Sequence, residues 1–132
     1  MKNLVNEIIT FIETLTFDYT VEVRKANSKK VPSYPMITVQ EIDNATRTHI
    51  NGQEIYSTLG YQFDIFGKDY NRISSSEICK NIAQKLDSEL QNEYGFTRQT
   101  IAELPDTKDI SVSRITIRYK GILNIQTDYL YR

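Results

Sequence analysis

The segment from Ser57 to Leu90 constrains the fold most strongly, because local chemistry specifies a strand, a turn and a helix within it. Apolar and polar residues alternate from Ser57 to Gly67. A period of two is typical of a strand with one buried face. We expect the residues of odd number to face the core: Leu59, Tyr61, Phe63 and Ile65. Residues 67–71 then break the alternation and end the strand.

An amphipathic helix follows this turn. Ser74 and Glu77 have the spacing of a capping box, and Ile73 and Ile78 have that of a hydrophobic staple. Apolar residues then recur at spacings of three and four: Ile78, Cys79, Ile82, Ala83, Leu86 and Leu90. Gly95 follows the last turn, where a left-handed cap is expected. We predict that this helix and the preceding strand bury their apolar sides against each other.

Shorter patterns predict the remaining elements. They are a helix over 3–15, capped by Asn3, and strands over 17–25, 35–42, 96–104 and 110–127. The last range is either one long strand or a bent pair, with Gly121 as the expected bulge or bend. The fold class is therefore α+β, an antiparallel sheet of four to six strands with two helices on one face, in the order α-β-β-β-α-β-β. The length of the chain, 132 residues, indicates one domain that spans residues 1–132.

Residues 43–55 are the least constrained part of the chain. They contain two turn signals, Asp43-Asn44 and Asn51-Gly52. One interpretation is the tip of a long hairpin that joins the strand over 35–42 to the strand after Ser57. The other is a mobile loop. In both cases we expect an exposed segment that becomes more ordered in an assembly.

Composition favours a cytoplasmic protein without strong affinity for nucleic acid. The formal net charge is −1, whereas dedicated nucleic-acid binders usually carry a basic excess. No apolar run is long enough to cross a bilayer. Asn6 and Glu7 interrupt the region that a signal peptide needs to be apolar.

A search for catalytic or metal-binding residues gives no constellation. Cys79 lies within the apolar stripe of its helix, which predicts a buried structural thiol. His49 has no neighbouring His, Cys or Asp at metal-ligand spacing, and the glycines are too far apart for a phosphate loop. Asp64 and Asp69 are candidate paired acids, but we expect Asp64 on the solvated face of its strand. We therefore predict a protein that is not an enzyme and that has no cofactor and no metal.

A basic cluster precedes the strand over 35–42. It comprises Arg24, Lys25, Lys29 and Lys30, and it is either a solvated loop or a contact for an acidic partner or a phosphate backbone. The candidate partner contacts are these four residues together with four from the segment 43–55: Arg47, His49, Asn51 and Gln53.

Three segments together resemble small phage tail-terminator proteins, also called tail-completion proteins or minor capsid proteins of the neck. The first is the proline-flanked segment Val31-Pro-Ser-Tyr-Pro-Met-Ile-Thr-Val39. The second is Tyr61-Gln-Phe-Asp-Ile-Phe-Gly-Lys68, which leads into the helix after Ser74. The third is the ending from Arg118 to Arg132, a strand followed by a short Tyr-Arg tail. The size and the order of elements match over nearly the whole chain.

The resemblance implies a structural virion protein without catalysis. Members of this family form a hexameric ring on the tail tube, end its polymerisation and join it to the head. The implied partners are other copies of the chain, the tail tube protein, a head-completion (stopper) protein, and DNA that passes through the lumen without sequence-specific binding. The implied location is the host cytoplasm during assembly and then the tail or neck of the virion. The alternative is a small α+β module that binds a ligand or a nucleic acid, because fold does not fix function.

Overall fold

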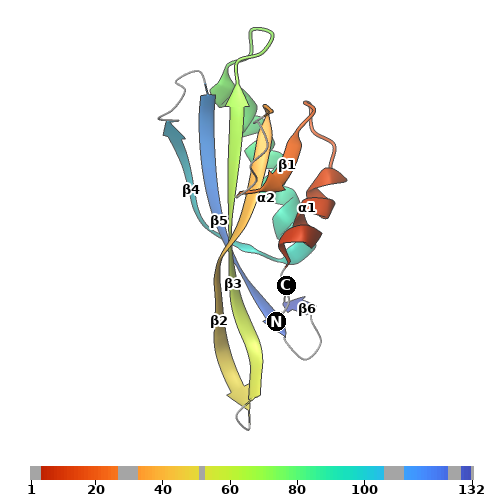
Figure 1. Cartoon of the computed structure of the whole chain (residues 1–132), viewed down its shortest axis with the longest axis vertical. Helices are drawn as coiled ribbons and strands as arrows, with labels where there is room; N and C mark the ends of the chain where they lie inside the picture. The colour runs from red at the N-terminus through yellow and green to blue at the C-terminus, as the bar shows by residue number, and fades with distance from the viewer. Residues whose placement is uncertain (1–3, 27–32, 51–52, 106–111, 125–128, 132) are drawn as a thin grey trace.

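The computed structural model describes residues 4–26, 33–50, 53–105, 112–124 and 129–131. Two layers are present, a sheet and a pair of helices on one of its faces (Figure 1). The elements are α1 (Val5–Glu13), β1 (Glu22–Lys25), β2 (Met36–Ile50), β3 (Gln53–Lys68), α2 (Ser75–Tyr94), β4 (Thr97–Pro105), β5 (Val112–Asn124) and β6 (Tyr129–Tyr131). The predicted α+β class and order of elements are therefore confirmed.

The sheet is mixed, so the prediction of a purely antiparallel sheet is wrong for one pair. The strand order is β1-β2-β3-β5-β4, with β6 paired to one end of β5. β1 runs parallel to β2, and the other neighbours are antiparallel. Alternation predicts which side chains of a strand face the core, but it carries no information on the direction of the strand. The connection over 26–35 is longer than a tight hairpin and lets the chain return before β2 begins.

Local capping fixes both ends of α2 as the sequence predicts. The hydroxyl of Ser74 accepts a hydrogen bond from the backbone N–H of Glu77 at 3.2 Å. The carboxylate of Asp69 accepts another from the N–H of Ser75 at 2.7 Å. At the other end Gly95 has φ 65°, and its N–H donates to the carbonyl of Gln91 at 3.0 Å. These bonds satisfy backbone groups that a helix end leaves without partners.

β3 lies at the centre of the core. Its residues of odd number, Leu59, Tyr61, Phe63 and Ile65, are all fully buried. They pack in one cluster with buried residues of α1, with the predicted stripe of α2, and with Ile115, Ile117 and Tyr119 of β5. The predicted core between the sheet and α2 is confirmed.

A close approach between β3 and α2 requires the glycine at the end of the strand. A Cβ added to Gly67 would lie 2.8 Å from the Sγ of Cys79 and 3.0 Å from the carbonyl oxygen of Ser75. Both contacts are too short for a real side chain, so only glycine lets the first turn of α2 pack this closely.

Three boundary predictions differ from the structure. The strand predicted over 17–25 is confined to β1, because only those residues find a neighbour in β2. The N-cap of α1 is Leu4, not Asn3, and it makes no side-chain capping bond. β5 keeps an unbroken register with β3 past Gly121, so the expected bulge there is absent and the long-strand alternative holds.

The segment 43–55 forms a hairpin rather than a loop. β2 and β3 continue as paired strands up to Ile50 and Gln53, with irregularities of register near Asp43 and Thr48 (Figure 1). β5 accompanies β3 only as far as the pair Tyr56 and Asn124. We call the paired strand ends over 43–50 and 53–55 the arm. On β3, Gln53 to Ile55 extend beyond the last pair with β5. On β2, the pairing with β1 ends at Val39, well before the arm.

No helix in the described part of the chain is long and apolar enough to span a membrane.

Candidate functional site: surfaces for assembly

The predicted basic cluster is not a single exposed patch. The Arg24 side chain is only 9 % exposed and forms an ion pair with Glu22, so it belongs to the sheet and not to a solvated loop. Lys25 is exposed at the end of β1. Lys29 and Lys30 lie outside the described residues. Of the two described members, Arg24 therefore has a structural role within the sheet and Lys25 lies on the surface.

The arm carries the other predicted contacts, far from that cluster. Arg47 and His49 lie on β2 and Gln53 begins β3, whereas Asn51 lies outside the described residues. Lys25 pairs with Val39 of β2. The run along β2 from Val39 to the end of the arm is on the order of 35 Å at the rise of an extended strand. The predicted contacts that the structure describes therefore do not form one site.

Cys79 is confirmed as a buried structural thiol. It is fully buried, and its sulfur contacts the carbonyl oxygens of Ser113 at 3.3 Å and Ile65 at 3.6 Å. Burial raises the pKa of this thiol to about 12. Burial therefore favours the protonated thiol over the thiolate, which is the reactive form. Among the described residues, no group of His, Cys, Asp and Glu has the arrangement of a metal site.

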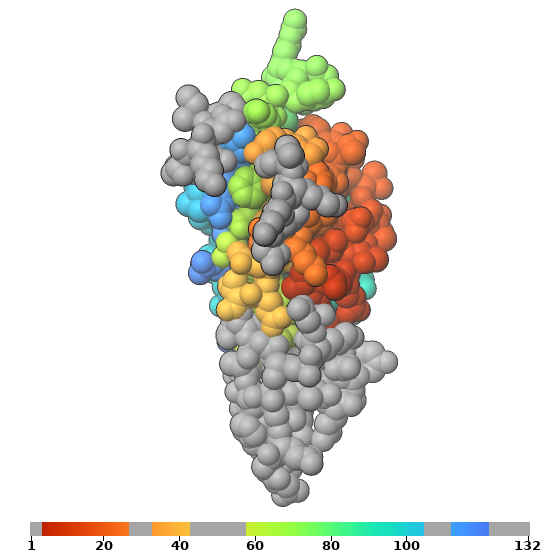
Figure 2. Space-filling view, viewed as in Figure 1, coloured from red at the N-terminus to blue at the C-terminus, as the bar shows by residue number. Residues whose placement is uncertain are grey.

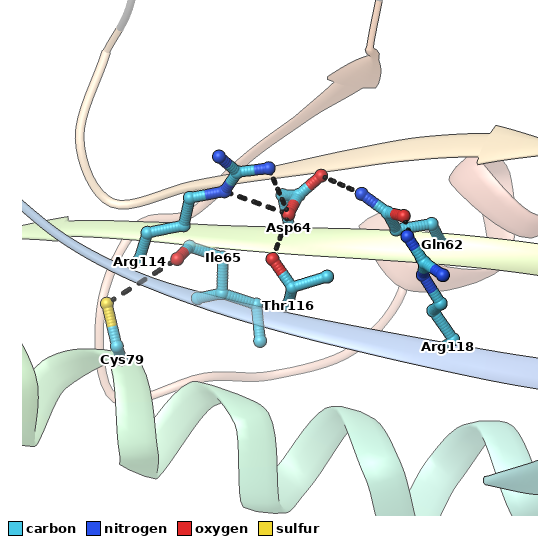
Figure 3. A network of polar contacts seen from close by, with 7 residues as sticks. All are labelled: Gln62, Asp64, Ile65, Cys79, Arg114, Thr116 and Arg118. Atoms are coloured by element: carbon cyan, nitrogen blue, oxygen red, sulfur yellow. Dashed lines mark hydrogen bonds and ion pairs between the residues drawn. The ribbon is translucent and has the colours of Figure 1, made fainter. Parts of the chain in front are cut away.

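Asp64 is the centre of a buried polar network on the face of the sheet that the helices leave free (Figure 3). Its Oδ1 accepts hydrogen bonds from the Nε of Arg114 at 3.0 Å and the hydroxyl of Thr116 at 2.5 Å. The Nη2 of Arg114 lies 2.9 Å from the same oxygen. Oδ2 accepts from the amide of Gln62 at 3.0 Å, and Arg118 donates to Gln62 in turn at 3.0 Å. The network ties β3 to β5 across three successive pairs.

The expectation that Asp64 is solvated is wrong, since Asp64 is only 4 % exposed. Its neighbours on β5 supply long side chains that cover the carboxylate and hydrogen-bond to it. Asp69 has a separate role as the acceptor at the start of α2, so the two acids do not act as a pair. Alternation within β3 alone shows the face of Asp64, but the strand register is needed to find Arg114 and Thr116, fifty residues later in the chain.

A groove of about 550 Å³ lies at the end of the molecule away from the arm. It is lined by Asp18, Tyr19, Thr20, Tyr34, Pro35, Lys68, Asp69, Tyr70 and Ile78. The ammonium of Lys68 lies 5.6 Å from the centre of the Tyr34 ring, within the range of a cation–π contact. Sequence reasoning missed this groove because four separate stretches of the chain form it: 18–20, 34–35, 68–70 and Ile78.

The turn between β3 and α2 borders this groove, and Figure 2 shows it in green, protruding from the end of the molecule. Tyr70 and Ile73 exchange two backbone hydrogen bonds, at 3.0 and 2.8 Å. Between them Asn71 and Arg72 both have positive φ, 46° and 68°, as in a type I′ turn. Tyr70 is 64 % exposed, so this end of the molecule presents an aromatic ring to a partner or to solvent.

Comparisons with known proteins do not place the chain in a family. No protein-family model matches the sequence, and a search of curated proteins finds no match. The resemblance to tail terminators therefore stays a prediction, carried by the three segments quoted above.

Proposed function

We propose that this protein is a structural component of a phage virion, a tail terminator that forms a ring of six copies on the tail tube and joins the tail to the head. The proposal is for an assembly role without catalysis. The observation that carries it is the arm made by β2 and β3, whose end extends beyond the third strand of the sheet.

We expect a partner surface to stabilise the arm. A two-stranded hairpin is marginally stable by itself, and packing against further structure is what normally stabilises it. Among the side chains that the structure describes, the buried cluster of the sheet includes Val39 on β2 and Leu59 on β3. An arm of this kind is suited to contact a neighbouring subunit or the tail tube protein.

A ring requires heterologous contacts, in which one surface of each subunit meets a different surface of the next. The arm and the groove beside Tyr70 lie at opposite ends of β3, so the subunit has distinct surfaces for distinct neighbours (Figure 1). The stopper protein and the tube protein are the proposed partners at these two ends. Which end meets the head is left to experiment.

Passage of DNA through the ring is compatible with the charges of the subunit. The formal net charge is −1, so the chain as a whole does not attract phosphates. Arg118 and Lys120 are exposed on the helix-free face of the sheet. Two cations of this kind provide non-specific contact with a phosphate backbone and no means of reading sequence.

The test is a phage that lacks this protein, examined by electron microscopy. The proposal predicts filled heads separate from tails of uncontrolled length. Complementation with the intact gene should restore joined particles. Tails of normal length attached to heads in the absence of the protein would contradict the proposal.

The second candidate function is a binding module, and the groove lined by Tyr19, Tyr34 and Tyr70 is the observation that favours it. Aromatic walls with a few polar groups are typical of ligand sites. Size-exclusion chromatography with light scattering separates the two functions. A protein that stays monomeric with tail tubes and binds a small ligand or an oligonucleotide tightly would support this alternative.

A further inference from the structure

β4 borders the sheet on the side away from β1, and its outer edge is open (Figure 1). In the described ranges of the chain, β4 pairs with β5 and with no other strand. An open edge presents backbone N–H and C=O groups that can pair with another strand. Two large apolar side chains of β4 are also exposed, Ile101 at 47 % and Leu104 at 39 %.

The opposite edge of the sheet differs from β4 in both length and surroundings. β1 has only four residues, and α1 packs beside it (Figure 1). Short strands and flanking helices are common ways of protecting an edge. β4 has nine residues, more than twice the length of β1. Beyond Val39 the opposite edge is formed by β2, whose pairing with β3 is interrupted by three register shifts.

A β-bulge determines which side chains of β4 lie on the helix side. The register shifts between Arg98 and Thr100, so that Arg98 lies opposite Tyr119 on the helix side and Thr100 lies opposite Arg118 on the other face. Ile101 and Glu103 also lie on the helix side, opposite Ile117 and Ile115. Without the bulge Arg98 would share a face with Thr100, because residues two apart in a regular strand point the same way.

We propose that two copies of this protein pair through β4 in an antiparallel, two-fold arrangement centred on Ile101. In this register Ile101 meets Ile101 of the second copy, and Glu103 meets Arg98 of the second copy. On the other face Ala102 lies opposite Thr100, and Leu104 lies opposite Thr97. Gln99 is the extra residue of the bulge and has no partner of its own. The register beyond it therefore shifts by one residue, so that Glu103 faces Arg98 rather than Gln99, and Leu104 faces Thr97.

The charges of β4 specify this register. Glu103 and Arg98 meet twice, once on each side of the two-fold axis, and cross-strand pairs of opposite charge are favourable. A shift by two residues would instead place Ile101 opposite a charged side chain. On the helix side, only the alignment centred on Ile101 pairs opposite charges with each other and the apolar side chain with itself.

Both charged residues have partners in their own chain and are still partly exposed. The guanidinium of Arg98 contacts Asp87 at 3.0 Å. Glu103 accepts a hydrogen bond from the hydroxyl of Ser76 at 2.7 Å and lies 3.7 Å from the ammonium of Lys80. The Arg98 and Glu103 side chains are still 44 % and 43 % exposed. Arg98 has five N–H donors, so it can bond Asp87 and the carboxylate of the second copy together.

The pair is separate from the proposed ring. An isologous contact uses the same surface on both copies and closes at two subunits, whereas a ring joins two different surfaces. The inference therefore concerns the isolated protein and does not rest on the tail-terminator function.

The first test is the mass of the purified full-length chain by light scattering over a range of concentrations. The wild-type protein should rise from 15.4 kDa towards twice that value as concentration increases. Ile101→Lys should stay at 15.4 kDa, with an unchanged circular dichroism spectrum because the site is half-exposed. A wild-type protein that stays monomeric would overturn the inference. A hexamer that Ile101→Lys leaves intact would also overturn it, while supporting the ring.

The second test uses a short bifunctional thiol cross-linker, so that disulfide geometry does not limit the result. Ile101→Cys should give a covalent dimer, since that residue meets itself across the axis. Leu104→Cys alone is the matched control and should give none, because Leu104 faces Thr97 of the second copy. Adding Thr97→Cys to Leu104→Cys should restore the dimer. Equal cross-linking of both single variants would contradict the register.

Discussion

The hydroxyl of Tyr119 donates a hydrogen bond of 2.5 Å to Oδ1 of Asp87, and this bond joins the middle of β5 to α2. The other oxygen of Asp87 accepts from Arg98 of β4 at 3.0 Å. One carboxylate on the helix therefore holds two strands. Tyr119 is almost fully buried, so its hydroxyl has little access to water if this acceptor is lost.

Asp87→Ala should lower the free energy of unfolding by about 1–3 kcal/mol, the cost of leaving a buried hydroxyl without a partner. Asp87→Asn retains an acceptor and should cost less. Urea denaturation of the two variants measures the difference. Equal losses for both substitutions would show that charge, and not the hydrogen bond to Tyr119, matters here.

Asp64→Ala should destabilise the protein by about 2–4 kcal/mol, because Arg114 and Thr116 lose their shared acceptor in a buried network. Asp69→Ala is the control for removing an exposed carboxylate, with an expected loss of about 1 kcal/mol from the start of α2. The same urea titrations compare the two. A smaller effect for Asp64 than for Asp69 would contradict the role of the network.

Leu86→Ala should cost about 2–5 kcal/mol, as truncation of core residues does. Leu86 is fully buried between α2 and the sheet. Gln84→Ala, at an exposed position of the same helix, should change stability by less than about 0.5 kcal/mol. Unchanged denaturation midpoints for both variants would exclude Leu86 from the core.

The capping of α2 and the core face of β3 are predictable from sequence because both depend on residues close together in the chain. Ser74 with Glu77, Gly95, and the alternation around Phe63 each act over a few positions. The direction of β1 and the partners of Asp64 depend on which strands lie side by side. Neither follows from local patterns, because pairing joins residues as far apart in the chain as Tyr56 and Asn124.

Stability should fall in alkaline solution. Burial raises the pKa of Cys79 from 9.0 to about 12 and that of Tyr94 from 10.0 to about 12, and it raises the pKa of Tyr61 and Tyr119 as well. Each pKa is higher in the folded state, so the stabilisation is complete below the unfolded value and is lost as pH rises towards the folded value.

The free energy of unfolding should therefore be level near pH 8 and decrease from about pH 9 to pH 12. Urea denaturation at stepped pH values measures this decrease. Cys79→Ala should make the decrease begin nearer pH 10, since tyrosines then contribute alone. A rise in stability over the same range would contradict the assigned direction.

Limited proteolysis of the isolated protein should cut first within residues 43–55. Residues 53–55 lie beyond the last pair of β3 with β5, Tyr56 and Asn124, and residues 43–50 of β2 lie beyond its last pair with β1, so local opening costs little there. Mass spectrometry of early fragments identifies the cut. Protection of this segment on addition of tail tubes would indicate its contact surface, whereas first cuts inside α2 would contradict the expected order of opening.

β3 runs without interruption from the arm to the turn that precedes α2, sixteen residues or roughly 50 Å of extended chain. It is hydrogen-bonded along that length to β2 on one side and mostly to β5 on the other. A tensile force on the arm would act parallel to β3. It would therefore load the hydrogen bonds between β3 and its two neighbours in shear, all at the same time. The strand transmits tension from one end of the subunit to the other with little stretching, which gives it mechanical strength along its axis.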